Sequence, residues 1–225
     1  MKFDILSSIP KGFGDYFDQS VIGRARQRGI IDVKIYDIRD WAHDKHRKID
    51  DSPFGGGPGM VIKIQPIYDA VEFLKSKTTH LSSDRKNNKS KSGTRVILFS
   101  TRGKLFTQNE AKRLSKYKNL ILICGRYEGV DERVAKHIAD EEISVGDFIL
   151  SGGEIPAMIV VDAVSRFVPG VLGKNESLEE IKGSYPTYTR PEIFYPNKKS
   201  KGWKTPKILM LGDHHKIKEW REKNS

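Results

Sequence analysis

The chain has 225 residues, of which 37% are hydrophobic and 31% charged, a composition typical of a folded globular protein and not of a disordered one. Its 40 Lys and Arg residues outnumber its 29 Asp and Glu residues, and the formal net charge of +11 favours a polyanionic partner such as a nucleic acid. The longest strongly apolar stretch, Ala157–Val161, is too short to span a bilayer, and the first residues lack the apolar segment of a secretory signal. One cysteine cannot form an internal disulfide, so we expect a cytoplasmic protein.

Short apolar runs alternate with helical patterns over the first part of the chain. Strands are predicted at Met1–Leu6, Val33–Tyr36, Arg95–Phe99 and Leu120–Cys124. Helices are predicted at Gln19–Arg28, Ile64–Lys77, Thr107–Tyr117, Asp131–His137 and Ile155–Phe167. Strands that are separated by helices favour an α/β fold with a mostly parallel sheet.

Two segments lack this pattern. Ser76–Gly93 is rich in Lys, Ser and Thr and is predicted to be a mobile surface loop, either an idle insertion or a contact with nucleic acid. After Gly170 the amino-acid composition changes. Asn175–Lys204 is rich in Pro, Gly, Lys and Tyr and is predicted to be linker and irregular structure. A basic helix is expected at His215–Lys223. A second, smaller domain therefore begins near Gly173.

Three glycine-bearing stretches are candidates for chemistry. The first, Phe54–Met60, has four glycines in the five positions 55–59 and forms either a tight structural turn or a close backbone approach to a ligand. The second, Gly125–Arg133, follows an apolar strand, where α/β proteins place ligands, although Asp131 and Glu132 also suit a helix start. The third, Ser144–Glu154, has apolar residues between Gly146 and the pair Gly152 and Gly153. This pattern suits a loop that wraps around a flat, uncharged ring of a ligand.

The remaining nucleophile and metal candidates are weak. Cys124 lies within an apolar run and fits a core residue better than a nucleophile. His43 and His46 have helical spacing but no third ligand near them in the sequence. His214 and His215 begin the last basic helix, where contact with RNA is more plausible than a metal site.

Together these strings resemble the TrmD family of bacterial tRNA (guanine-N1)-methyltransferases, which are knotted SPOUT enzymes. The resemblance lies in Gly55–Met60, Cys124–Gly129, Ser144–Glu154, Asp162–Gly173 and Tyr188–Pro191, in the family's order. It implies a parallel sheet with a deep trefoil knot and a small, mostly helical carboxyl-terminal domain. It also implies a homodimer with each active site at the subunit interface, S-adenosylmethionine as methyl donor, and tRNA as substrate.

The resemblance also implies three domain ranges and the residues of two binding sites. Residues 1–160 would form the knotted methyltransferase domain, 161–173 a segment leading out of it, and 174–225 a linker and tRNA-binding domain. The donor would lie among Leu98, Phe99, Ser100, Thr101, Cys124, Gly125, Tyr127, Glu128, Gly129, Ser144, Val145, Gly146, Asp147, Phe148, Ile149, Leu150, Gly152 and Gly153. The target guanosine, at tRNA position 37, and its neighbour would be held by Asp50, Gly55, Gly56, Gly57 and Gly59, and the tRNA also by His214.

Methylation of guanine N1 needs a base for its proton and a cation for the charge that grows on O6. On the resemblance, Arg166 matches the family's cation, and Glu128 would orient groups near the sulfonium. The family's base is an Asp in the linker after Gly173, from the opposite subunit, but here that linker contains no Asp. Glu176 fits best, because Ser and a large apolar residue follow it, while Glu179 and Glu180 remain candidates.

Three further points stay open at the level of sequence. The family is associated with Mg²⁺, for which no set of ligands is visible in the sequence. Lys198, Lys199, Lys201, Lys204 and Lys207 around Trp203 suit an RNA-binding surface or a solvated basic tail. Ribose 2′-O-methylation by another SPOUT enzyme and RNA binding without turnover are the alternatives to N1 methylation.

Overall fold

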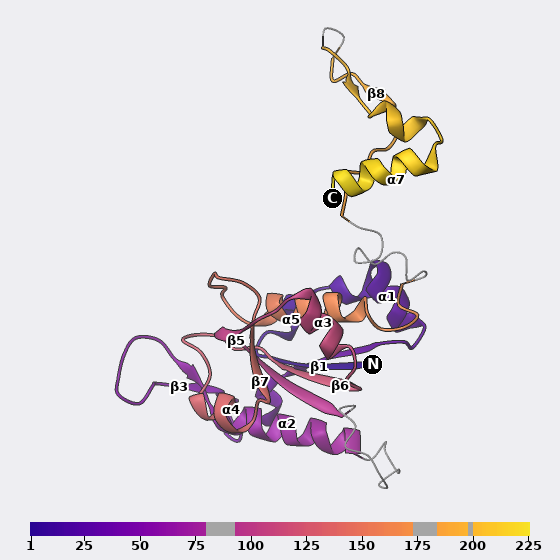
Figure 1. Cartoon of the computed structure of the whole chain (residues 1–225). Coiled ribbons are helices and arrows are strands. Elements are labelled where there is room, and N and C mark those ends of the chain that lie inside the picture. The colour runs from indigo at the N-terminus through magenta and orange to yellow at the C-terminus, as the bar shows by residue number, and fades with distance from the viewer. Residues whose placement is uncertain (80–92, 173–183, 198–199) are drawn as a thin grey trace. The chain divides into compact units, whose positions relative to one another are not determined.

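A computed structural model describes residues 1–79, 93–172, 184–197 and 200–225 of the chain (Figure 1). The chain divides into two compact units, Met1–Leu172 and Gly173–Ser225. Helix α5 (Glu154–Ser165) runs unbroken across residues 160 and 161, and Val161 and Val164 pack into the core of the first unit. Among the described residues, no helix is both long and apolar enough to cross a membrane.

Five parallel strands form the sheet of the first unit, as the alternation of strands and helices predicts. Their order is β2 (Asp32–Asp37), β1 (Lys2–Ser7), β6 (Asn119–Ile123), β5 (Thr94–Leu105) and β7 (Glu141–Ser144). All four pairings are parallel, with Phe3 opposite both Val33 and Leu120. The prediction of an α/β fold with a parallel sheet is therefore confirmed, although β7 was not predicted and β5 extends beyond Phe99.

Helices cover both faces of this sheet (Figure 1). On one face α1 (Ser20–Gln27), α3 (Gln108–Leu114) and α5 pack on alternate strand residues, among them Phe3, Leu120 and Leu122. On the other face α2 (Ile64–Thr79) and α4 (Glu132–His137) pack on the residues between them, such as Ile121 and Ile123. Strands buried on both faces read as unbroken apolar runs, which is why β5 and β6 were predictable.

Helix boundaries differ from the predictions mainly at their ends. The observed α1, α3, α4 and α5 each lie within a few residues of the predicted helix, and Gly29 follows α1 with a φ of +68°. Helix α2 continues to Thr79, so the predicted loop Ser76–Gly93 begins too early. The rest of that loop, residues 80–92, lies outside the described residues.

The glycine-rich stretch Phe54–Met60 joins two short antiparallel strands that were not predicted, β3 (Asp50–Asp51) and β4 (Val61–Ile62). Gly55, Gly56, Gly57 and Gly59 have φ values between +77° and +125°, a region that side chains disfavour. Four such residues within five positions make this a turn that other residue types would strain.

The second unit holds an antiparallel hairpin of β8 (Ile193–Phe194) and β9 (Trp203–Lys204), a 3-10 turn and α7 (His214–Lys223). The prediction that Asn175–Lys204 is irregular throughout is wrong at this hairpin. Its strands are short, and they are held in part by the tilted contact of Phe194 with Trp203, whose ring centroids lie 5.6 Å apart. The predicted helix at His215–Lys223 is confirmed.

Candidate functional site

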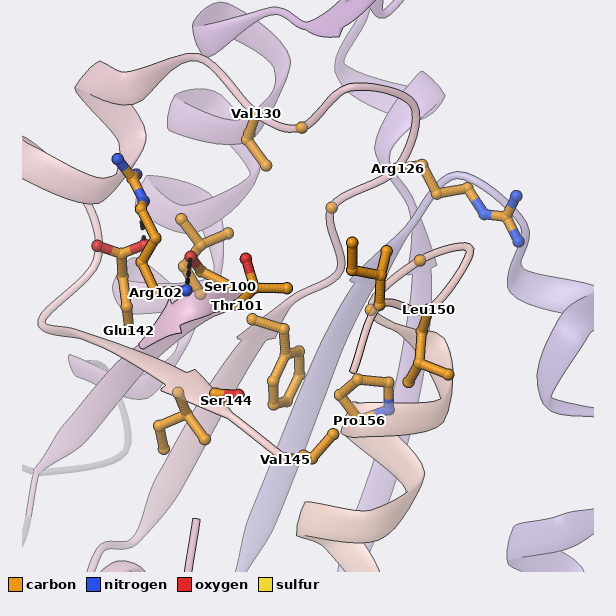
Figure 2. A pocket seen from close by; sticks show the side chains of 18 of the residues that line it. Ser100, Thr101, Arg102, Arg126, Val130, Glu142, Ser144, Val145, Leu150 and Pro156 are labelled. Atoms are coloured by element: carbon orange, nitrogen blue, oxygen red, sulfur yellow. Dashed lines mark hydrogen bonds and ion pairs between the residues drawn. The ribbon is translucent and has the colours of Figure 1, made fainter. Parts of the chain in front are cut away.

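Three loops meet at the carboxyl ends of the adjacent strands β6, β5 and β7 and enclose a pocket of about 550 Å³. Parallel sheets bind ligands at this edge because the loops there converge. Figure 2 shows Ser100, Thr101 and Arg102 from one loop beside Ser144, Val145 and Leu150 from another. The lining residues come from 98–102, 125–130 and 142–146, from 148–153, and from α4 and α5.

A bulge in β5 presents the first loop to the pocket. Ile143 of β7 pairs with Phe99 and again with Lys104, so residues 100–103 arch out of the ladder between them. Gly103 is required there, because a Cβ atom on it would lie 2.5 Å from the backbone nitrogen of Ile143. Bulges of this kind re-aim side chains beside binding sites.

The third loop, which ends at Gly152 and Gly153, closes against the second. The backbone N–H of Gly153 donates a hydrogen bond of 2.9 Å to the carbonyl of Gly125, and Arg126 forms an isolated bridge with Gly152. A Cβ atom on Gly153 would lie 2.6 Å from the Cα atom of Cys124. The two backbones can therefore meet only if residue 153 is glycine.

A buried carboxylate fixes the same junction. Glu154, 6% exposed in the first turn of α5, accepts a hydrogen bond of 2.7 Å from the hydroxyl of Ser7, at the end of β1. Its other oxygen lies 3.4 Å from Nε of Arg126. A carboxylate at a helix amino terminus is also stabilised by the helix dipole. Glu154 thus ties β1, α5 and the second loop together beneath the pocket.

The glycine-rich turn between β3 and β4 adjoins the second loop. The N–H of Glu128 donates to the carbonyl of Met60 at 3.0 Å, and the N–H of Ile62 donates to the carbonyl of Gly129 at 3.0 Å. A Cβ atom on Gly59 would lie 2.4 Å from the Glu128 side chain. Two stretches that the sequence separates by more than sixty residues are therefore joined through their backbones, although the glycine-rich turn itself does not line the pocket.

One rim of the pocket is charged. Nη2 of Arg102 lies 2.7 Å from a carboxylate oxygen of Glu132 and 3.7 Å from one of Glu142. The hydrogen bond from Arg102 lowers the pKa of Glu132 below its ordinary value. Arg102 and Glu142 were not predicted from the sequence; the only signal was that Arg102 directly follows Thr101, one of the expected donor-binding residues.

Most residues expected to bind the donor line this pocket. Cys124 does not, because it lies fully buried beneath the loops, and Asp147 is outside the lining. Burial raises the pKa of the Cys124 thiol well above its usual value, with a smaller contribution from the charge of Glu154, so the thiol stays protonated and unsuited to nucleophilic attack. The pocket-lining members are Leu98, Phe99, Ser100, Thr101, Gly125, Tyr127, Glu128, Gly129, Ser144, Val145, Gly146, Phe148, Ile149, Leu150, Gly152 and Gly153.

The other expected site residues lie away from the pocket wall. Asp50 is in β3, at the base of the glycine-rich turn, and His214 begins α7 in the second unit. Arg166 is exposed at the carboxyl end of α5, about 15 Å from Pro156 at the rise of an α-helix, and does not line the pocket. Glu176, Glu179 and Glu180 lie outside the described residues.

The outward side of α5 carries an apolar stripe. Ile155 and Ile159, one turn apart, are 53% and 39% exposed, although the opposite side of the helix is fully buried. Asp162 and Arg166 continue the same stripe at helical spacing. Ile155 and Ile159 therefore form a small exposed apolar patch that leads toward Asp162 and Arg166.

No group of three or more His, Cys, Asp or Glu side chains that could hold a metal ion occurs in the part of the chain that the structure describes. His43 instead lies 2.7 Å from a carboxylate oxygen of Asp69 on α2.

Comparison with protein families gives a match over residues 1–225 to the model described as tRNA (Guanine-1)-methyltransferase TrmD. Several proteins named tRNA (guanine-N(1)-)-methyltransferase are similar to the chain over its whole length. That of Clostridioides difficile (strain 630) is 46% identical over 230 residues, covering 100% of this chain and 92% of the relative. That of Dehalococcoides mccartyi (strain CBDB1) is 44% identical, covering 100% and 86%, and that of Dictyoglomus turgidum is 46% identical, covering 100% and 85%.

Proposed function

The chain belongs to the TrmD family of tRNA (guanine-1)-methyltransferases, and on this premise we propose that it methylates N1 of the guanosine at tRNA position 37, with S-adenosylmethionine as the donor. The observation that carries the proposal is the convergence of three loops on one pocket at the carboxyl edge of the sheet. Two of these loops approach so closely that Gly153 contacts the backbone of Cys124.

The pocket suits a nucleoside-containing donor. Val145, Leu150 and Pro156 give it an apolar wall, and the loop 144–153 offers backbone groups between its glycines (Figure 2). The Ser144 hydroxyl donates to the carbonyl of Gly146 at 2.9 Å and so holds the loop in shape. S-adenosylmethionine supplies a methyl group on a positively charged sulfonium, which the exposed carboxylate of Glu128 complements. From the resemblance to the family we also propose a trefoil knot in this region.

We assign the proton chemistry to two side chains. Glu176 accepts the proton of guanine N1, with Glu179 and Glu180 as the alternatives in a linker without Asp. The guanidinium of Arg166 stabilises the negative charge that grows on O6 as this proton leaves. We propose no side-chain ligands for the Mg²⁺ that the resemblance to the family suggests.

The position of Arg166 supports a homodimer. It lies at the far end of α5 from the pocket of its own subunit, so it serves a second copy of the chain more readily than its own pocket. The exposed stripe of Ile155 and Ile159 leads to Arg166 and supplies an apolar surface for that contact. Each active site then takes its donor pocket from one subunit and Arg166 from the other.

We place tRNA binding in the second unit and the enzyme in the cytoplasm. Trp203 is 66% exposed on the hairpin next to Lys204, and Lys201 lies between the two strands in sequence. An exposed aromatic ring among lysines suits stacking on a base while the lysines neutralise phosphates. His214, at the start of α7, belongs to the same unit.

The test is methyl transfer from labelled S-adenosylmethionine to tRNA transcripts with G or A at position 37, comparing wild type with E176Q. We expect label on the G transcript alone and a loss of turnover of at least about 100-fold in E176Q, because general-base catalysis contributes about 10²–10⁴-fold. E179Q and E180Q are the matched controls for loss of one linker charge. If E176Q keeps full turnover, the base is instead Glu179 or Glu180, whichever of the two loses turnover when it is replaced by glutamine. Absence of label with wild type would contradict the proposed function.

A further inference from the structure

Asp162 and Arg166 are neighbours on α5 that would be expected to pair. The N–H of Arg166 donates to the carbonyl of Asp162 at 3.3 Å, so the two residues lie one helical turn apart on the outward stripe. Side chains of opposite charge at this spacing commonly form an ion pair. In the described part of the chain, no ion pair joins them, and the Asp162 carboxylate has another partner.

That partner is Tyr16. Its hydroxyl donates a hydrogen bond of 2.5 Å to Oδ2 of Asp162, across 146 positions of sequence. The bond to the carboxylate raises the pKa of Tyr16 to about 12, so the phenol remains a donor at every pH at which the protein works.

The ring of Tyr16 is held in place by the core. It meets the ring of Phe17 edge-on, with centroids 5.5 Å apart, and Phe17 stacks on Phe13 at 5.9 Å. Both phenylalanines are buried, at 2–3% exposure. The adjacent Asp18 pairs with Arg26 of α1, which fixes the other end of the same turn. The ring of Tyr16, itself 42% exposed, is therefore oriented toward Asp162 by its contact with buried Phe17.

We propose that Tyr16 is a positioning residue for methyl transfer: it holds the Asp162 carboxylate away from Arg166 and so leaves the Arg166 guanidinium unpaired for the substrate. A carboxylate paired with Arg166 would neutralise the cation and oppose the negative charge on O6. The inference rests on the role proposed above for Arg166. It assigns a task to Tyr16 and Asp162, neither of which lines the pocket.

The experiment is a double-mutant cycle of Y16F and D162N, read as kcat with saturating S-adenosylmethionine and the G37 transcript. Y16F should lower kcat by about three- to tenfold, because the freed carboxylate can pair with Arg166. In the D162N background the same Y16F change should have no effect on kcat, since no carboxylate is left to move. Y68F is the matched control, because Tyr68 lies exposed on α2, which covers the other face of the sheet.

A purely structural role for Tyr16 would give the same loss in both backgrounds, and this result would overturn the inference. Wild-type kcat in Y16F, beside an inactive R166A, would also overturn it and leave the proposed function intact. Wild-type turnover in R166A would remove both the role of Arg166 and the inference from it.

Discussion

Replacing Arg166 by alanine should lower kcat by about 100- to 1000-fold, the usual cost of removing one group that stabilises charge in a transition state. The affinity for S-adenosylmethionine should not change, because Arg166 does not line the pocket. The fold should also be retained, since the side chain is exposed at the end of α5. The measurement is single-turnover methyl transfer to the G37 transcript, together with calorimetric titration of the donor.

R24A is the matched control for R166A. Arg24 is exposed on α1, and its replacement removes the same single charge from a strongly basic protein. Any general weakening of tRNA binding through net charge would therefore appear equally in both variants. If R166A kept wild-type kcat, or if R24A lost as much, Arg166 would have no specific part in the reaction.

The sheet was predictable where its strands are buried on both faces. The apolar runs that form β5 and β6 place alternate side chains in the core on each face of the sheet. An unbroken apolar run is the pattern expected of a strand that is buried on both faces. Strand β7 was missed because it lies at the edge of the sheet and begins with two glutamates. Glu141 is paired there with Arg95 and Arg113, which come from other elements.

The second and third loops of the candidate site were predictable because they carry glycines, whereas Leu98–Thr101 was expected only from the resemblance to the family. The groups around them were not, because tertiary structure brings them together. Arg102 reaches Glu142 only through the bulge of β5 between Phe99 and Lys104. Ser7 and Glu154, which support the pocket from below, are separated by 147 positions in the sequence. No local pattern encodes a contact of that kind.

Replacing Gly153 by alanine should weaken donor binding by about five- to 150-fold. The new Cβ atom would lie 2.6 Å from the Cα atom of Cys124 and 3.1 Å from the nitrogen of Gly125, both on a rigid backbone. The loop must then move away and weaken its 2.9 Å hydrogen bond to Gly125. Overpacking of this kind costs about 1–3 kcal/mol, which corresponds to roughly five- to 150-fold in the dissociation constant.

G93A is the matched control for G153A, because a Cβ atom on Gly93 meets nothing within 4 Å and the residue has an ordinary φ. Its donor affinity should equal that of the wild type. Titration of S-adenosylmethionine and thermal unfolding of both variants separate loss of binding from loss of fold. A G153A protein that binds the donor normally would show that the two loops are free to separate and that their junction does not shape the pocket.

G153A and R166A together test whether the active site is shared between subunits. In a heterodimer purified through two different tags, the R166A subunit has an intact pocket and the G153A subunit an intact arginine. The donor is held below the dissociation constant of G153A, so that the G153A pocket stays largely empty. If Arg166 serves the pocket of the other subunit, one of the two sites is complete, and turnover should return to about half that of the wild-type dimer. If Arg166 serves its own pocket, neither site is complete, and the heterodimer should stay as inactive as either parent. Recovery of activity in the heterodimer would therefore show that each active site uses residues from both subunits.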